Sequence, residues 1–77
     1  MIPHNLKAEQ AVLGSIIEDP NCIFGISSDL LPSHFYDKSN AGIYEAMVSL
    51  VNRHVPVDLV TLISELEGKE RLDSVGG

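Results

Sequence analysis

The sequence predicts an all-α fold, a compact orthogonal bundle of about four to five short helices. Three observations support this class. Apolar residues recur every three or four positions in separate segments, as they do along one face of a helix. No segment alternates apolar and polar residues over a useful length, and no Asn-Gly or Asp-Gly hairpin signal occurs. The prolines fall between the periodic segments, where they would separate helices.

The first periodic segment predicts a helix from Leu6 to Glu18, with Asn5 as its N-cap. Asp19-Pro20 should end this helix, because the residue before a proline is disfavoured in the α region. Proline also suits the first turn of a following helix, so Asp19 is expected to cap a second, weaker one. That second helix would carry Ile23, Ile26 and Leu30.

The stretch from Leu31 to Tyr36 is expected to form a turn or one short helical turn. Its two aromatic residues, Phe35 and Tyr36, should anchor it in the core. The next segment, Ser39 to Asn52, has the widest apolar stripe of the chain, with Ser39 or Asn40 as its expected N-cap. We therefore predict that this helix is the central element on which the others pack.

The connection from Arg53 to Val57 is polar and contains Pro56, so it should not be helical. Asp58 is then expected to cap a last main helix, Leu59 to Glu67, with Gly68 as its C′ residue. Residues 69–75 are expected to add one more turn. The apolar stripes together predict a core made of Leu13, Ile17, Phe35, Ile43, Met47, Leu50, Leu62 and Leu66.

The charge balance favours a protein partner over a nucleic acid. The 77 residues carry 11 acidic and 5 basic side chains, a net charge of −6, and the basic residues form no run. Binding to nucleic acid depends largely on phosphate neutralisation, so we expect no direct nucleic-acid binding. The single cysteine, Cys22, fits a reducing compartment, and no apolar run approaches the length of a membrane span. The expected location is therefore cytoplasmic, without membrane association.

The sequence offers no arrangement typical of catalysis. We expect this chain to be non-catalytic and to bind no cofactor. The possible metal ligands do not lie three to five residues apart, so none is paired by a helical turn: His4, Cys22, His34 and His54. The only Gly-Lys pair, at residues 68–69, lacks the upstream glycine and the following Ser or Thr of a phosphate-binding loop. Glu65 and Glu67 are the candidate partner-binding residues, although charge runs are more often just a solvated helix end.

Five short blocks stand in order along the chain. They are PHNLKAEQAVLG at residues 3–14, LPSHFY at 31–36, IYEAM at 43–47, PVDLVTL at 56–62 and LDSVGG at 72–77. In this order and spacing, the blocks resemble the N-terminal domain of the DnaB-type replicative DNA helicases. One departure is clear: that family usually has histidine where this chain has Asn40.

The resemblance implies that residues 1–77 form the helicase collar domain, incomplete at its C-terminal end and without the ATPase domain. The intact protein would be a hexameric, ATP-driven ring helicase that unwinds DNA at replication forks. Its collar would stabilise the ring and dock primase and, in some systems, a helicase loader. ATP and magnesium would bind only in the missing domain.

Two other functions are compatible with the residues alone. The chain could be a stand-alone helical adaptor, which a stop codon shortly after Gly77 would favour. It could also be a small helix-turn-helix DNA-binding module, because short helices joined by tight turns can build one. Tight, salt-sensitive DNA binding would favour the second alternative.

Overall fold

The computed structural model describes the backbone of residues 5–74 and the side chains of residues 5–69. The elements in chain order are α1 (Leu6–Glu18), the 3₁₀ turn η1 (Pro20–Cys22), α2 (Ile23–Ile26), the 3₁₀ turn η2 (Pro32–His34), α3 (Lys38–Asn52) and α4 (Leu59–Ser74). The described part of the chain contains no strand, so the predicted all-α class is confirmed.

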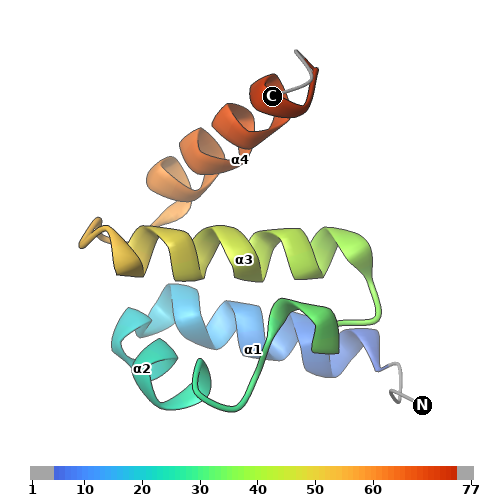
Figure 1. The fold of residues 1–77 in the computed structure, drawn as a ribbon. Helices are drawn as coiled ribbons and strands as arrows, with labels where there is room; N and C mark the ends of the chain where they lie inside the picture. Colours follow the sequence, from blue (N-terminus) through green and yellow to red (C-terminus); the bar gives the residue numbers. More distant parts are fainter. Residues whose placement is uncertain (1–4, 75–77) are drawn as a thin grey trace.

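Helix α3 is the centre of the fold, as the sequence predicts. It runs beside α1 in the same direction, and the segment containing α2 and η2 leads the chain back to its start (Figure 1). Helix α4 crosses the opposite side of α3 and leans away from it toward the C-terminal end (Figure 1). One flank of α3 therefore packs on α1 and η2, while the other contacts only α4.

The core gathers on α3. Its side chains with less than 2% exposure include Tyr44 and Met47, and the Tyr44 ring lies 5.1 Å from the ring of Phe35. Of the residues predicted to be buried, five are confirmed: Leu13, Phe35, Met47, Leu50 and Leu62. Three more, Ile17, Ile43 and Leu66, are only half-buried beside the core. The prediction missed Ile16, Ile23, Tyr44, Ala46 and Val57, all of which are buried.

The start of α1 agrees with the prediction, and the start of α3 does not. The Asn5 side-chain oxygen accepts a hydrogen bond from the Ala8 N–H at 3.0 Å, as an N-cap does. The cap of α3 is Asp37, whose carboxylate accepts from the Asn40 N–H at 2.9 Å. The predicted caps, Ser39 and Asn40, therefore lie inside the first turn of α3.

The second helix is shorter than predicted. Asp19 makes no side-chain capping bond to it, and Pro20 begins a 3₁₀ turn that leads into four α-helical residues. Gly25 is a poor helix former, which agrees with a helix that ends at Ile26. Leu30 therefore lies beyond the helix, although it still packs on the core.

Two further predictions were wrong. Tyr36 is 56% exposed, because the chain turns outward between η2 and α3 and only Phe35 enters the core. Gly68 does not end the last helix, which continues to Ser74. The residues around Gly68, including Leu66, Glu67 and Lys69, are strong helix formers, and their preference outweighs the cost of about 1 kcal/mol for one glycine.

The end of α3 is a Schellman cap. The Val55 N–H donates to the Leu50 carbonyl at 2.9 Å, and the His54 N–H donates to the Val51 carbonyl at 3.0 Å. His54 has a φ of 60°, the left-handed conformation that this cap requires. The cap turns the chain sharply, so α4 starts beside the end of α3.

Candidate interaction surface

A carboxylate on α1 holds the loop that leads into α3. Glu9 accepts hydrogen bonds from the Tyr36 N–H at 2.7 Å, the Asp37 N–H at 3.4 Å and the Asn40 side-chain amide at 3.0 Å. The Asn40 bond, followed by the two backbone bonds, favours the charged form and lowers the pKa of Glu9. The sequence alone does not reveal this role of Glu9, because none of its partners lies within 26 residues of it.

The polar part of the core is also paired. The Tyr44 hydroxyl donates to the Leu30 carbonyl at 2.7 Å, and burial raises the pKa of the Tyr44 phenol. Among the described residues, no buried side-chain nitrogen or oxygen lacks a hydrogen-bond partner. The core therefore contains no orphaned polar group that would indicate a ligand.

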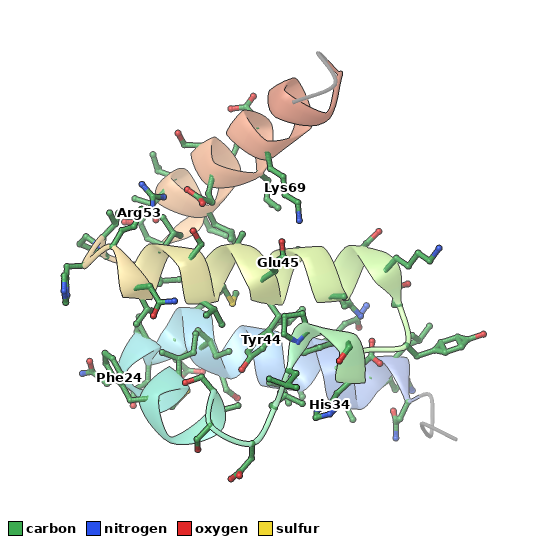
Figure 2. The ribbon with its side chains drawn as sticks, in the orientation of Figure 1. Phe24, His34, Tyr44, Glu45, Arg53 and Lys69 are labelled. Atoms are coloured by element: carbon green, nitrogen blue, oxygen red, sulfur yellow. The ribbon has the colours of Figure 1, made fainter. Side chains whose placement is uncertain are left out.

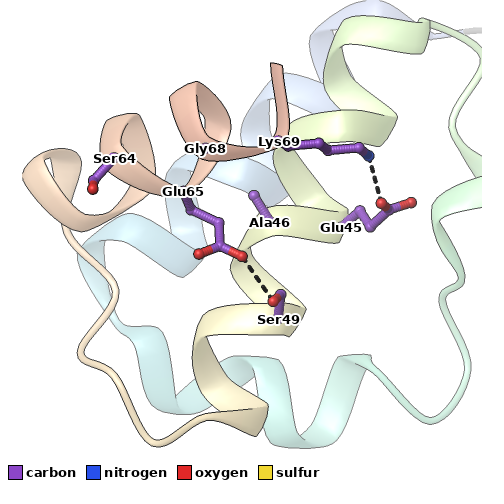
Figure 3. Close-up of a pocket in the computed structure, with 7 residues that line it drawn as sticks. All are labelled: Glu45, Ala46, Ser49, Ser64, Glu65, Gly68 and Lys69. Atoms are coloured by element: carbon purple, nitrogen blue, oxygen red, sulfur yellow. Dashed lines mark hydrogen bonds and ion pairs between the residues drawn. The ribbon is translucent and has the colours of Figure 1, made fainter. Parts of the chain in front are cut away.

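A cleft lies between α3 and α4 where α4 leans away. We call it the α3–α4 cleft; its volume is about 480 Å³, within the range of small-molecule sites. Figure 3 shows the residues that line it: Glu45, Ala46, Ser49, Ser64, Glu65, Gly68 and Lys69. Most small-molecule sites are lined chiefly by apolar and aromatic side chains, whereas only small and charged residues line this cleft.

Polar contacts across the α3–α4 cleft join its two helices. The Ser49 hydroxyl donates to Glu65 at 2.8 Å, and Arg53 pairs with the same carboxylate. Farther along, Lys69 pairs with Glu45 at 2.5 Å (Figure 3). The described residues that line the cleft include no histidine, the usual general base beside a serine nucleophile. These contacts support a structural role for the cleft.

The two predicted partner-binding residues lie in different surroundings. Glu65 faces α3 and is held by Ser49 and Arg53, with 24% of its side chain exposed. Glu67 is exposed on the other side of α4. The structure thus separates the two carboxylates, and only Glu67 stands on the outward surface of the helix.

An apolar patch accompanies Glu67 on the outward surface of α4. Leu59 is 64% exposed, Val60 77% and Ile63 55%. Val60, Ile63 and Glu67 follow one another at i, i+3 and i+7, so they share one side of the helix. We call these four residues the α4 face. The apolar stripe of α4 is wider than the contact of α4 with α3, so Leu59 and Ile63 remain exposed.

A second apolar feature lies beside the connection between α3 and α4. Phe24 is 66% exposed and lies at the edge of the molecule, whereas Tyr44 lies between α3 and α1 (Figure 2). Phe24 borders a shallow groove with Val51, Val55 and Pro56. This groove and the α4 face are two apolar surfaces that the described residues offer to a partner; Leu6, Leu31 and Tyr36 are also exposed.

The described residues offer no site for metal chemistry. Within that part of the chain, no group of three or more His, Cys, Asp or Glu side chains could hold a metal ion. The candidate His4 lies outside the described residues, and the Cys22 thiol is half-buried, 3.8 Å from the Ser15 carbonyl.

No helix in residues 5–74 is long and apolar enough to cross a membrane.

Comparison with known proteins places the chain among replication proteins. All of residues 1–77 match the family described as the DnaB-like helicase N terminal domain. The chain is 48% identical over 75 residues to the "Replicative DNA helicase DnaC" of Bacillus subtilis, and 41% identical over 75 residues to the "Replicative DNA helicase DnaB" of Geobacillus stearothermophilus. Both alignments cover 97% of this chain but only 16% of the relative.

Proposed function

The chain belongs to the DnaB-like helicase N-terminal domain family, and we propose that it is the structural and protein-docking part of a replicative DNA helicase. The observation that carries this proposal is the family match over residues 1–77. In this proposal the domain acts in the cytoplasm as part of a collar. The collar stabilises a hexameric ring and docks primase or a helicase loader.

The surface of the domain suits docking better than gripping DNA. Arg53 and Lys69 are already paired with glutamates, which reduces the positive charge available to phosphates. The net charge of −6 would repel a DNA backbone and attract a basic protein surface. The apolar α4 face adds the uncharged contact area that protein interfaces use at their centre.

The helicase chemistry itself would belong to a longer protein. The relatives from Bacillus subtilis and Geobacillus stearothermophilus are each about six times as long as the part that this chain matches, and this chain lacks a phosphate-binding loop. We propose that ATP and magnesium bind a separate ATPase domain of that longer protein. This domain would then contribute to unwinding only through ring assembly and partner docking.

Two measurements test the proposal. Calorimetric titration of the purified 77-residue chain with the primase of the same organism should show saturable binding. Removal of residues 1–77 from the intact helicase should weaken ring assembly in sedimentation velocity. Failure of primase to bind, together with unchanged ring assembly after the removal, would refute the proposal.

A DNA titration separates this function from the helix-turn-helix alternative. We expect no binding of duplex DNA by the chain at physiological salt. Tight binding that weakens steeply with added salt would favour the DNA-binding module instead, because such a slope reports released counterions.

A further inference from the structure

Among the residues whose side chains the structure describes, none covers the α4 face, and this face has a definite chemical pattern. Its three apolar side chains are each more than half exposed and lie within five consecutive residues of one helix. Together they expose on the order of 300 Å² of apolar surface, a size at which a patch on a monomer is often functional. The inward side of α4 is already occupied, because Leu62 is buried and Lys69 pairs across to α3.

Carboxylates bracket this apolar surface along the helix. Asp58 stands immediately before it and caps α4, with its side chain accepting from the Thr61 N–H at 2.9 Å. Glu67 stands one turn beyond Ile63 and is exposed. A complementary partner would therefore present apolar side chains flanked by positive charges at both ends.

The charge pattern also disfavours a second copy of this chain as the partner. Each copy carries a net charge of −6, and its five basic residues are spread along the sequence. Two of them, Arg53 and Lys69, already pair with glutamates of the same chain. The described helices therefore provide no basic apolar face that would complement the α4 face.

We infer that the α4 face is the docking surface for a basic amphipathic helix of another protein. The incoming helix would place apolar residues at i, i+3 or i+4, and i+7 over Val60 and Ile63. Amphipathic helices bind other proteins through anchor residues at this spacing. Lys or Arg residues at its flanks would face Asp58 and Glu67. This inference rests on the proposed docking function and assigns it a surface and a partner chemistry.

The test uses the full 77-residue chain and two probes. The first probe is primase. The second is a designed amphipathic peptide of leucine and lysine, the Leu/Lys helix, whose length of about 18 residues is enough for it to form a helix in water. A Leu/Glu helix of the same length is its charge control. We expect the primase and the Leu/Lys helix, but not the Leu/Glu helix, to shift the NMR methyl signals of Leu59, Val60 and Ile63.

Matched variants locate the contact. Val60→Gln combined with Ile63→Gln should weaken binding of both probes by about tenfold or more, as loss of a central apolar contact does. Both substitutions fall at exposed positions, and an unchanged circular dichroism spectrum confirms that the variant is folded. Phe24→Gln makes the same kind of change on the other apolar surface and should leave binding within about twofold.

Each outcome separates the surface from the function. If primase binds equally well to the α4 variant, or loses binding only with Phe24→Gln, the inferred surface is wrong while the docking function stands. If primase does not bind the unaltered chain, the primase-docking part of the proposed function fails, and the Leu/Lys helix alone decides the surface: shifts away from α4, or none, would overturn the inference.

Two other occupants of the α4 face are also outcomes of the test. A dimer in sedimentation velocity that the Val60→Gln and Ile63→Gln variant abolishes would assign the face to a second copy. If the natural protein extends past residue 77, protection of the Val60 and Ile63 methyl groups there, without any partner, would assign the face to a later segment. Either result would overturn the inference.

Discussion

The substitution Met47→Ala tests whether the core is centred on α3. The Met47 side chain is 1% exposed, on the helix that packs against α1, η2 and α4. Loss of the atoms beyond Cβ removes about two methylene equivalents of transfer free energy, at about 0.8 kcal/mol each. A residual cavity of roughly 60 Å³ adds about 1.4 kcal/mol, at about 24 cal/mol per Å³. We therefore expect Met47→Ala to lower the free energy of unfolding by about 3 kcal/mol, within the usual range of about 2–5 kcal/mol.

Urea denaturation followed by circular dichroism measures this change. A domain of this size has an unfolding free energy on the order of 4–12 kcal/mol, so the expected loss shifts the midpoint strongly. Ile63→Ala is the matched control, because it also shortens an aliphatic side chain on a helix, but at a position that is 55% exposed. We expect it to change stability by about 0.5 kcal/mol or less. A Met47→Ala cost no larger than that of the control would show that the core lies elsewhere.

Substitutions at four other positions test separate contacts in the same assay. Tyr44→Phe should cost about 1 kcal/mol, because the Leu30 carbonyl loses its 2.7 Å donor; an unchanged midpoint would contradict this bond. Glu9→Gln should make the free energy of unfolding fall less steeply as the pH is lowered. The Asn40 bond and two backbone bonds lower the Glu9 pKa in the fold, so the stability from Glu9 is present above the ordinary glutamate pKa and lost as the pH falls through the lower folded value. If the variant loses stability as steeply at acid pH as the unaltered chain, this explanation is wrong. Asn40→His should keep more stability than Asn40→Ala, since histidine retains an N–H donor for Glu9; equal midpoints would mean that the contact contributes nothing. Gly14→Ala should raise stability by about 0.5–1 kcal/mol, because the added methyl meets nothing within 4 Å on α1, and a loss would reveal a contact there.

The features that the sequence predicts well are those decided within a few residues. The Leu6–Glu18 helix and its Asn5 cap depend on a local hydrogen bond and a local apolar period. The same holds for Asp58, which caps α4 through the N–H of a residue three positions later. Local signals competed at the start of α3, where Asp37, Ser39 and Asn40 are all good capping residues. In the structure, the loop before α3 places Asp37 at the N-cap position.

The features that the sequence could not predict depend on contacts between distant residues. The role of Glu9 requires that residues 36–40 fold back over α1, which no periodicity reports. The continuation of α4 through Gly68 brings Lys69 to Glu45, a partner 24 positions away. The orientation of α4 also decides which side of its broad apolar stripe is covered. Leu62 became buried and Ile63 exposed, although they are adjacent and equally apolar.

The departure at Asn40 shows how a contact can persist when the residue changes. The family resemblance leads us to expect histidine at this position, and in the structure the Asn40 side-chain amide donates a 3.0 Å hydrogen bond to Glu9. That bond requires a donor near the first turn of α3, and both an amide and an imidazole supply an N–H. Glu9 in turn holds the backbone of Tyr36 and Asp37, so the donor helps to fix the loop that delivers the α3 cap. The constraint at this position therefore falls on the donor and its reach, which explains why asparagine is compatible with the same fold.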